Sequence, residues 1–597
     1  MNVEICNHLR SLREFMERER FSAFIFLSSD AHQSEYVPEH WKGRAWISGF
    51  DGSAGIAVVT KNGAALWTDS RYFLAAESQL QDTEFVLMRE KIAGTPSIFE
   101  WLEEQLENEQ NKVVGIDGNT ISYGLADVFV KSLDVYGISM RFDVDPLDSI
   151  WNNRPPIPSN EIRRHPEEFC GESTLAKIDR IRQKLNDLRC EGMLVSSLDD
   201  IAWTLNLRGD DIHCTPVFVS YLFIGKERVI LFVNDEKIPT DVANYLQTID
   251  VCVAPYDSIC TYFSKEEMKC SVLLDPAETS YRVYNALKDG KITVVSGESP
   301  IPRMKAIKNP TEINGFKNAM VKDGVALVKF LKWLRPAVEA GGQTEISVSD
   351  KLESLRSENE NYIGLSFDTI AGYESHGAIV HYEADAISDA MLLPKGFLLL
   401  DSGAQYQDGT TDITRTIPLG PLTDEQRKIY TLVLRSHIRL EMAKFPELAT
   451  GTQIDAICRE PLWEHGLNFL HGTGHGVGSF LSVHEGPHQI RMEYVKTPLV
   501  AGMTVTDEPG IYVKGKFGVR IENTLLIKKY KDTDFGSFLQ MEPLTLCPID
   551  VEPIISELME PKEINWLNNY HKLVNEKLSP YLNSEEKTWL EAETRPI

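Results

Sequence analysis

The sequence lacks the features of several large classes of protein. No apolar run approaches the roughly eighteen residues that a membrane-spanning helix requires, and the apolar segment 217–224 is interrupted at Ser220. Positive charge is also scarce: 61 Lys and Arg stand against 88 Asp and Glu, for a net charge of −27, which repels phosphate backbones and anionic lipids. We therefore expect no membrane span and no nucleic-acid partner.

We also expect neither disulfide-paired cysteines nor a secretory leader. The nine cysteines are odd in number and include no CxxC pair, a pattern typical of reduced thiols rather than of disulfides. The first residues, MNVEICNHLRSLREFMERERF, carry charged residues throughout and place Ile5, Leu9, Leu12 and Met16 at helical spacing, without the apolar core of a signal peptide. This pattern predicts a first helix and a cytoplasmic protein.

Three common catalytic motifs are absent as well. The chain has no GxGxxG after a strand, no GxxxxGK[ST] and no GxSxG, so a dinucleotide site, a phosphate-binding loop and a hydrolase elbow have no motif support. Asp401-Ser402-Gly403 offers a serine nucleophile, but the acidic residues around it would then have no role.

The length and pattern of the chain indicate several domains, one of them repeated. At about 150 residues per domain, 597 residues suggest two to four domains. An amphipathic helix, a short apolar strand at 21–27 and a hairpin at 56–68 occur in the same order as a helix from Thr174, a strand at 192–195 and a hairpin at 217–233. This order favours a duplicated α/β unit.

Prolines and helix caps mark the domain boundaries. Five prolines between 145 and 173 exclude long helices and inner strands there, and Asn309-Pro310-Thr311-Glu312 begins a long helix that we expect to reach about Leu334. A third, α+β domain follows, and an amphipathic helix after Pro561 predicts a terminal extension packed on it. The expected domains are 1–155, 156–302 and 303–597, with a C-terminal helical extension from about 536. The third domain is expected to contain helices at 423–444 and 452–466 and strands at 364–372, 396–401 and 518–527.

Acids and histidines gather in four segments of this third domain. They are DSGAQYQDGTTDITRT (Asp401 and Asp412), HGTGHGVGSF (His471 and His475), SVHEGPH (His484 and His488) and DEPGIYVKGKFGVRIEN (Glu508 and Glu522). Asp401 ends an apolar run, where an isolated carboxylate is costly unless it is paired or bound to metal. The glycines around His471 and His475 disfavour a helix, so this segment is expected to be a loop or a strand that something approaches closely.

Taken one at a time, these residues have ordinary explanations, such as a capped turn or a solvated loop. Together, two Asp, two Glu and one His offer oxygen ligands and one imidazole, a set that suits Mn²⁺, Co²⁺ or Zn²⁺. Four carboxylates carry more negative charge than one dication neutralises. A pair of ions about 3.5–4 Å apart, sharing carboxylates, removes that difficulty and activates water for hydrolysis.

The four segments in this order resemble the pita-bread metallopeptidases, and the chain as a whole resembles their three-domain Xaa-Pro aminopeptidase family. The resemblance implies two tandem creatinase-like α/β domains followed by a pita-bread catalytic domain. It also implies two divalent ions, usually Mn²⁺, with Asp412 and Glu522 bridging them. Their implied ligands are Asp401, Asp412, His475, Glu508 and Glu522.

The resemblance assigns roles to further residues. His381, His471 and His484 match histidines near the metals that orient substrate, stabilise the oxyanion and move protons, and Glu508 relays a proton. Arg71, Tyr512 and Arg520 form the expected substrate-binding set, with Arg71 acting in its own subunit or in a partner's. Alternation along a strand also places Arg520 on the face of Glu522, where it would hold that carboxylate.

The implied activity is removal of the first amino acid from peptides with proline in the second position, by a hydroxide that bridges the metals, in a homodimer. A prolidase restricted to Xaa-Pro dipeptides and a binding protein without catalysis are the alternatives. After Glu508-Pro509-Gly510 the chain reads IYVKGK, where relatives often carry an acidic or aromatic stretch. This departure bears on substrate preference and leaves the ligand set complete.

Overall fold

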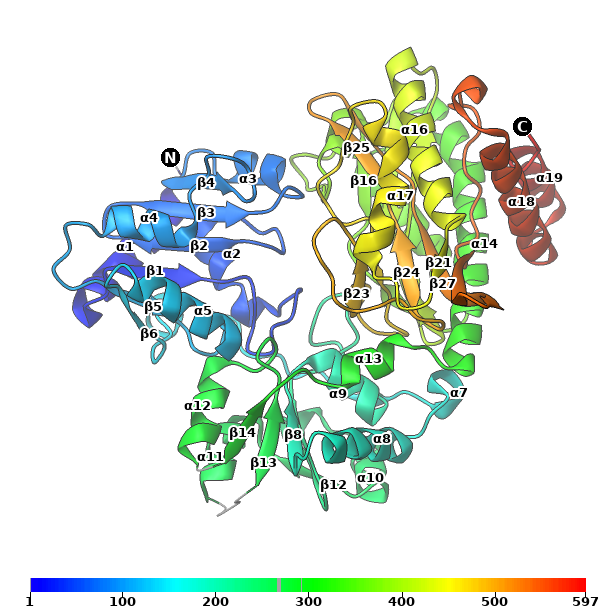
Figure 1. The fold of residues 1–597 in the computed structure, drawn as a ribbon. Coiled ribbons are helices and arrows are strands. Elements are labelled where there is room, and N and C mark those ends of the chain that lie inside the picture. Colours follow the sequence, from blue (N-terminus) through cyan, green and yellow to red (C-terminus); the bar gives the residue numbers. More distant parts are fainter. Residues whose placement is uncertain (1, 266–269, 291) are drawn as a thin grey trace. The chain divides into compact units, whose positions relative to one another are not determined.

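The structure, a computed structural model, describes residues 2–265, 270–290 and 292–597, which fall into two units (Figure 1). One unit spans the chain to His165 together with Glu172–Ile301, and the other combines Pro166–Gly171 with Pro302–Ile597. Among the helices of these described ranges, none has the length and apolar character needed to cross a bilayer.

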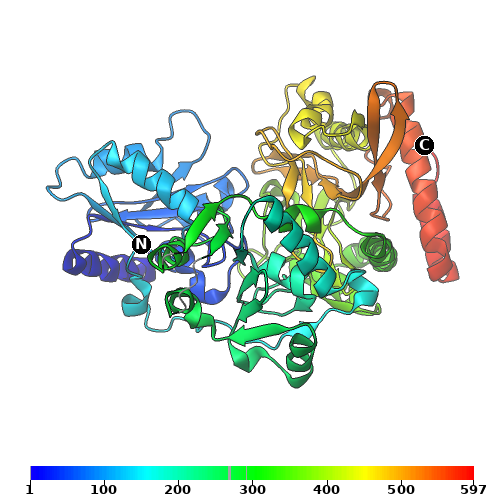
Figure 2. The ribbon, with the colours of Figure 1, turned by 60° about the horizontal axis from the view of Figure 1, so that its bottom comes forward.

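The first unit begins with a six-stranded mixed sheet in the order β4-β3-β2-β1-β5-β6. Helix α1 (Val3–Glu19) buries Leu9, Leu12 and Met16 on one face, and α4 (Ile98–Gln105) and α5 (Tyr123–Asp134) cover the other (Figures 1 and 2). The strands are β1 (Ala23–Phe26), β2 (Ile56–Thr60), β3 (Ala64–Thr68), β4 (Phe85–Arg89), β5 (Val113–Ile116) and β6 (Ser139–Arg141).

A second sheet in the same unit repeats this topology, in the order β12-β11-β10-β8-β13-β14. In both sheets two antiparallel pairings join the first three strands in chain order, and the other pairings are parallel. The predicted repeat is confirmed. Its strands are β8 (Gly192–Val195), β10 (Tyr221–Gly225), β11 (Val229–Phe232), β12 (Val251–Ala254), β13 (Ser271–Leu274) and β14 (Thr293–Ser296).

The second unit is built on the long helix α14 (Pro310–Ala340). Asn309 accepts hydrogen bonds from the backbone of Thr311 and Glu312, and Glu312 bonds back to Asn309, which completes the predicted N-terminal cap. The helix continues past the predicted end near Leu334 to Ala340, even though Pro336 lies within it. Helices α16 (Asp424–Glu441) and α17 (Gly451–Trp463) agree with the prediction.

Two predicted strands are interrupted in the structure. The expected strand 364–372 is two strands, β15 (Tyr362–Leu365) and β16 (Ile370–Tyr373), which join different sheets. The expected strand 518–527 is also two, β26 (Phe517–Arg520) and β27 (Asn523–Thr533). The second break arises because Ile521 N donates to Pro509 O and Glu522 N donates to Thr414 O, so both residues leave the ladder.

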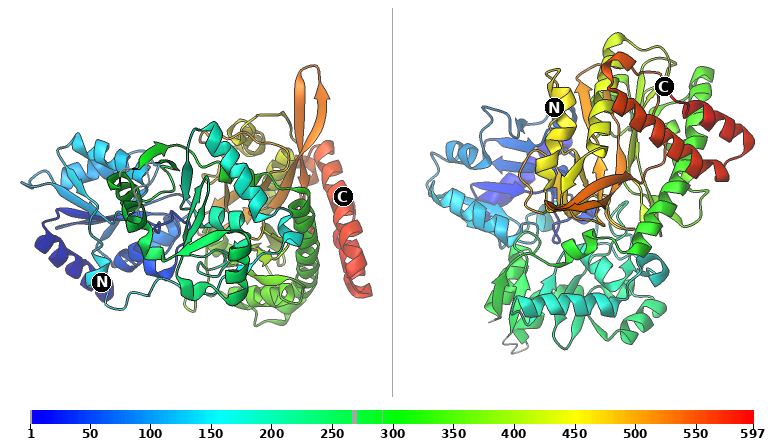
Figure 3. Two further views of the ribbon diagram at one scale, coloured as in Figure 1. Left: turned by 90° about the horizontal axis from the view of Figure 1, so that it is seen from below. Right: turned by 45° about the vertical axis from the view of Figure 1, so that its right-hand side comes forward.

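The C-terminal helices pack on this unit, as predicted, but they begin at Pro561, because Gly536–Pro543, where the helical extension was expected to start, is strand β28 paired with β27. Helix α18 (Pro561–Leu578) buries Leu567, Tyr570, Val574 and Leu578 in the same core as α16 and the strands β24 (Thr504–Asp507) and β27. Figure 3 shows α18 and α19 (Ser584–Glu593) lying along α14. The extension therefore supplies part of the core around the strands that carry the candidate site.

Candidate metal centre

Asp401 and Asp412 come from two neighbouring strands, β17 (Phe397–Ser402) and β20 (Ile413–Pro418). Asp401 pairs with Thr414 in the antiparallel register, while the adjacent Leu400 points to the opposite face, into an apolar core. Asp412 directly precedes β20 and is buried. The strand pair thus brings two carboxylates to one face of the sheet, and Asp401 is only 8% exposed, as its position after an apolar run predicted.

His475 lies on β22 (Gly474–Gly476), so the prediction of a loop or strand is confirmed. Its Nδ1 lies 2.9 Å from the carbonyl oxygen of Gly476, which can only accept, so Nδ1 carries the proton. Nε2 then faces Asp412 Oδ2 at 3.5 Å and Glu508 Oε1 at 3.6 Å. A neutral imidazole nitrogen pointing at two carboxylates is a ready metal ligand.

The glycines of this segment allow close backbone packing. A Cβ on Gly474 would lie 1.9 Å from Thr506 O, and one on Gly476 would lie 2.4 Å from Glu485 O. The backbone N–H of His475 donates to Thr506 Oγ1 at 3.1 Å. The expected close approach therefore comes from β24, the strand that leads to Glu508.

Glu508 and Glu522 lie at the same end of two paired strands, one just after β24 and the other just before β27. Glu508 N donates to Thr473 O, which fixes the residue just after β24. Glu522 lies in the break before β27, and its Oε2 accepts from Thr414 Oγ1 at 2.7 Å. Potential ligand atoms of Asp412, His475 and Glu522 all lie within 4.8 Å of one another.

The site carries a buried excess of negative charge. Burial, followed by the nearby Asp401 and Glu508, raises the pKa of Asp412 well above its usual range. The pKa of Glu522 is raised in the same way, by burial and then by Asp412, Asp401 and Glu508. Asp401 Oδ1 is buried and has no hydrogen-bond partner among the described residues. An oxygen-rich set with one imidazole and an unsatisfied carboxylate oxygen fits divalent cations.

Arg520 pairs with a different carboxylate from the one predicted. It donates to Asp401 Oδ2 at 2.6 Å and to Tyr512 OH at 2.7 Å, whereas Glu522 accepts from Thr414. The predicted pairing with Glu522 is wrong because β26 ends at Arg520, so strand alternation does not extend to residue 522. Burial alone would lower the pKa of Arg520, but Tyr512 and Asp401 raise it, and the guanidinium stays charged.

The predicted histidines lie around these groups. The His484 ring packs edge-on against His475, with ring centroids 4.4 Å apart. His471 Nδ1 faces Gly472 O, so its Nε2 accepts from Tyr512 OH at 2.8 Å, and burial raises the pKa of that hydroxyl to about 12. His381 is half-buried in the turn after η4 (Glu374–Ala378), next to Val380, whose carbonyl accepts from Arg520 at 3.4 Å.

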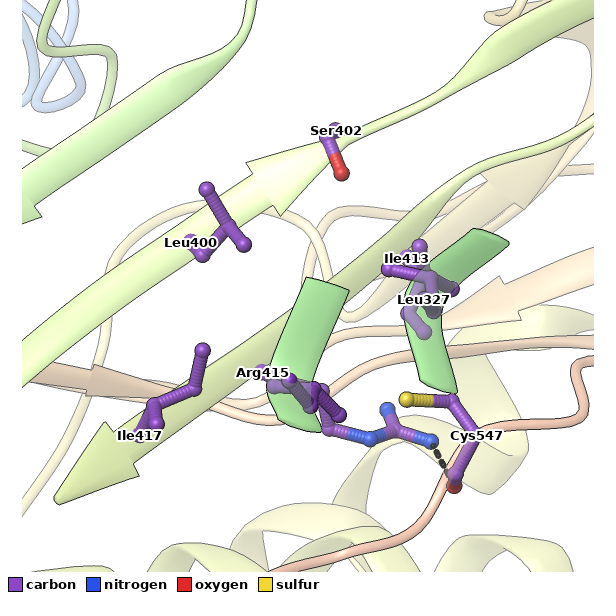
Figure 4. Close-up of a pocket in the computed structure, with 8 residues that line it drawn as sticks. Leu327, Leu400, Ser402, Ile413, Arg415, Ile417 and Cys547 are labelled. Carbon is purple, nitrogen blue, oxygen red and sulfur yellow. Dashed lines mark hydrogen bonds between the residues drawn. The ribbon is translucent and has the colours of Figure 1, made fainter. Parts of the chain in front are cut away.

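Arg71 lies in the first unit, where Asp69 accepts from its Nε and Nη2 at 3.0 and 2.8 Å. Its contact with substrate stays a prediction. The pocket in Figure 4 lies on the face of β17 and β20 that carries Leu400 and Ser402, away from the carboxylates. Its lining includes none of the predicted ligands, so it is not the expected substrate site.

A second buried set of polar residues was not predicted from the sequence. It consists of His437 and Glu441 on α16, Asp507 on β24 and Asn523 on β27. Burial raises the pKa of Asp507 well above its usual range and that of Glu441 to about 7, and it lowers the pKa of His437 to about 4. Asp507 and Asn523 stand next to Glu508 and Glu522 in the sequence, which was the one available signal.

The chain matches known families of protein domain along its length. Residues 314–529 match Metallopeptidase family M24, and residues 537–597 match the C-terminal region of peptidase_M24. Residues 8–140 and 153–312 each match a Creatinase/Prolidase N-terminal domain. The predicted fold, two creatinase-like domains followed by a pita-bread metallopeptidase domain, is confirmed.

Relatives that match over the full length of the chain identify its family more specifically. The chain is 40% identical to Xaa-Pro aminopeptidase 1 of Dictyostelium discoideum, covering all of this chain and 97% of that one, and 37% identical to Aminopeptidase P1 of Arabidopsis thaliana, covering 100% and 99%. It therefore belongs to the Xaa-Pro aminopeptidase family. The crystal structure of X-prolyl aminopeptidase from Caenorhabditis elegans, described as a cytosolic enzyme with a di-nuclear active site, matches with a TM-score of 0.94 at 34% identity over 99% of this chain and 100% of that chain.

A shorter relative matches only part of the chain. The Xaa-Pro dipeptidase from Bacillus anthracis is 25% identical with a TM-score of 0.51, and the match covers 63% of this chain and 99% of the dipeptidase.

Proposed function

We propose that this protein is a two-metal aminopeptidase that removes the first amino acid from peptides whose second residue is proline. The observation that carries the proposal is the convergence of His475 Nε2 and the buried carboxylates Asp412 and Glu522. It occurs in a chain whose relatives named Xaa-Pro aminopeptidase match over its full length.

The proposed ligands are the five predicted ones. By the resemblance, Asp412 and Glu522 would be the two carboxylates shared by both ions; both are buried, and Asp412 lies close enough to raise the pKa of Glu522. Two divalent ions held in this way would activate a water molecule and polarise the substrate carbonyl. We assign Mn²⁺ by the resemblance, with Co²⁺ and Zn²⁺ as alternatives that the oxygen-rich set also accepts. The five ligands are Asp401, Asp412, His475, Glu508 and Glu522.

The remaining residues bind and orient the substrate. In this proposal His484, which packs against His475, donates to the carbonyl oxygen of the first residue, and His381 binds the same end of the peptide. Glu508, partly exposed beside His475, moves a proton to the proline nitrogen. Arg520 holds Tyr512, and Tyr512 orients His471, so these three form one hydrogen-bonded chain along the site. Arg71 stays a predicted substrate-binding residue, acting in its own subunit or in a partner's.

The wider assignments follow the same resemblance. The proposed domains are 1–155, 156–302 and 303–597, and the second unit of the structure begins its main segment at Pro302. The proposed location is the cytoplasm, in line with the C. elegans relative, which is described as cytosolic. The proposed assembly is a homodimer, which sedimentation of the purified protein would test.

A prolidase accounts for less of the chain. The dipeptidase match leaves more than a third of the residues uncovered, whereas the aminopeptidase match leaves almost none. The alternative of a binding protein without catalysis has no support from the site, because all five ligand residues are present.

Peptide digestion separates these functions. Mn²⁺-loaded protein is given a pentapeptide with proline second, the matched pentapeptide with alanine second, and an Xaa-Pro dipeptide, and the products are followed by mass spectrometry. The proposal expects release of the first residue from the proline pentapeptide and at least a hundredfold slower release from the alanine peptide. Cleavage of the dipeptide alone would establish the prolidase instead.

A further inference from the structure

A fully buried polar cluster lies next to the candidate metal centre and includes the residues adjacent in sequence to Glu508 and Glu522. We call His437, Glu441, Asp507 and Asn523 the buried polar cluster; each is at most 2% exposed. His437 Nδ1 lies 3.2 Å from Asp507 Oδ2, and His437 Nε2 lies 3.3 Å from Glu441 Oε1. Asn523 Nδ2 donates to Glu441 Oε1 at 2.8 Å. The imidazole ring therefore lies between the two carboxylates, although among the described residues the Asp507 carboxylate oxygens accept no hydrogen bond.

The cluster acts on the strand ends that carry two proposed ligands. Asp507 immediately precedes Glu508, and Asn523 immediately follows Glu522. Asp507 and Asn523 are also opposite each other in the β24–β27 ladder. Both proposed ligands thus leave the sheet at the same rung. On α16, Glu441 accepts a hydrogen bond from Asn523 of that rung, and His437 packs 3.2 Å from Asp507.

Arg415 ties a third ligand strand to the same cluster. It lies on β20, three residues after Asp412, and its Nη1 donates to Glu522 O at 2.7 Å. Its Nη2 donates to Asn523 Oδ1 at 2.9 Å and to Cys547 O, the bond drawn in Figure 4. One guanidinium therefore fixes the backbone of Glu522 relative to the strand of Asp412.

The C-terminal extension completes the network. Tyr570 on α18 accepts from Arg415 Nη2 at 3.0 Å and donates to Thr545 O or Cys547 O. Its ring also stacks on Trp566, with ring centroids 5.2 Å apart, so removal of the hydroxyl alone leaves this packing in place.

We infer that the buried polar cluster, Arg415 and Tyr570 are positioning residues of the metal centre, which set the spacing of the strand ends that carry Asp412, Glu508 and Glu522. The inference rests on the proposed metal ligands. Metal ions bind tightly only when their ligands are held within a few tenths of an ångström, and groups that orient ligands change affinity by about 10–100-fold. A buried network in which several donors and acceptors are shared specifies one such geometry.

The test compares two tyrosine variants. Tyr570→Phe removes the hydroxyl that Arg415 uses. Tyr406→Phe is the matched control: it removes another buried tyrosine hydroxyl of the same unit, bonded to Asp323 Oδ1 at 3.2 Å and outside the network. Metal-stripped wild type and both variants are titrated with Mn²⁺, free Mn²⁺ is read by electron paramagnetic resonance, and the thermal unfolding of each metal-free protein is recorded.

We expect wild type and Tyr406→Phe to bind Mn²⁺ with the same affinity, and Tyr570→Phe to bind about tenfold more weakly or worse. Equal affinity in all three proteins, or equal weakening in both variants, would overturn the inference and leave the proposed function standing. Absence of Mn²⁺ binding by the wild type would overturn both. If Tyr570→Phe does not fold, His437→Gln is used in its place, and it is expected to show the same loss of affinity.

Discussion

His475 is held through both sides of its ring. The Gly476 carbonyl fixes Nδ1, His484 packs on the ring edge, and Nε2 is left facing Asp412 and Glu508. At the residue scale, the two histidines therefore have different proposed roles. In the proposal His475 binds metal, whereas His484 contacts His475 and binds the substrate.

Replacing His484 tests that difference in role. His484→Asn is expected to lower kcat by about 10²–10⁴-fold, the usual contribution of a side chain that donates or accepts a proton during catalysis. Its metal content should equal that of the wild type. His465→Asn, which changes an exposed histidine of the same unit, should leave kcat unchanged. Loss of metal from the His484 variant would show that His484 is a ligand.

The pair formed by His376 and Glu345 predicts a pH-dependent stability. His376 Nδ1 lies 2.9 Å from Glu345 Oε1, and this hydrogen bond raises the pKa of His376 above 6.5, although partial burial opposes it. A raised histidine pKa stabilises the fold below pH 6.5, and the contribution disappears as the pH rises through the folded-state value.

His376→Gln should therefore lower the stability at pH 6 by about 1 kcal/mol or less, because solvent screens a partly exposed pair, and by a smaller amount at pH 9. Thermal unfolding of the variant and the wild type at the two pH values measures the difference. A larger loss at pH 9 than at pH 6 would contradict the assignment.

Residue-level predictions from sequence were successful where local context was sufficient. Asp401 ends an apolar run, and its burial followed from that run alone. The partner of Arg520 was not predictable in the same way, because strand alternation assumes an unbroken strand and the break at Ile521 and Glu522 depends on Pro509 and Thr414. His437 carried no signal, since α16 and β24 meet only in the folded chain.

At the scale of elements, the glycine-rich segment around β22 controls how closely two strands pack. Gly474 lies against Thr506 of β24. A Cβ on Gly472, two residues earlier, would lie 3.7 Å from its nearest neighbour, which is an ordinary contact distance. The same sequence motif therefore contains one glycine that the packing requires and one that it does not.

Alanine substitutions distinguish the two glycines. Gly474→Ala places a Cβ 1.9 Å from Thr506 O, so β22 must move away from β24, at a cost of about 1–3 kcal/mol or more. This shift should also weaken metal binding, because it displaces His475. Gly472→Ala is the control and should retain both stability and affinity, as measured by thermal unfolding and Mn²⁺ titration. Unchanged affinity in Gly474→Ala would argue against close packing as the source of the His475 position.

The boundaries of helices and strands were predictable only where the local sequence determines them. The repeated helix, strand and hairpin of the first unit were predictable, because each is marked by its own periodicity and turn residues. The end of α14 and the breaks at β15–β16 and β26–β27 were not, because they depend on which neighbouring segments each one packs against or pairs with.

At the scale of the whole molecule, the net charge of −27 has one local consequence. Four of the 88 acidic residues, Asp401, Asp412, Glu508 and Glu522, are concentrated in the candidate metal centre. Burial of these groups raises the pKa of Asp412 and of Glu522, and two bound dications would neutralise the excess. At this position the acidic excess is the basis of the proposed activity.

Metal stoichiometry tests the central claim most directly. Wild type and Asp412→Ala, purified without chelator and dialysed against Mn²⁺, are analysed by inductively coupled plasma mass spectrometry and assayed on the proline pentapeptide. The proposal predicts two metal ions per wild-type chain, with loss of at least one ion and of nearly all activity in the variant. A wild type with no bound transition metal, or an Asp412→Ala variant with two ions and full activity, would contradict it.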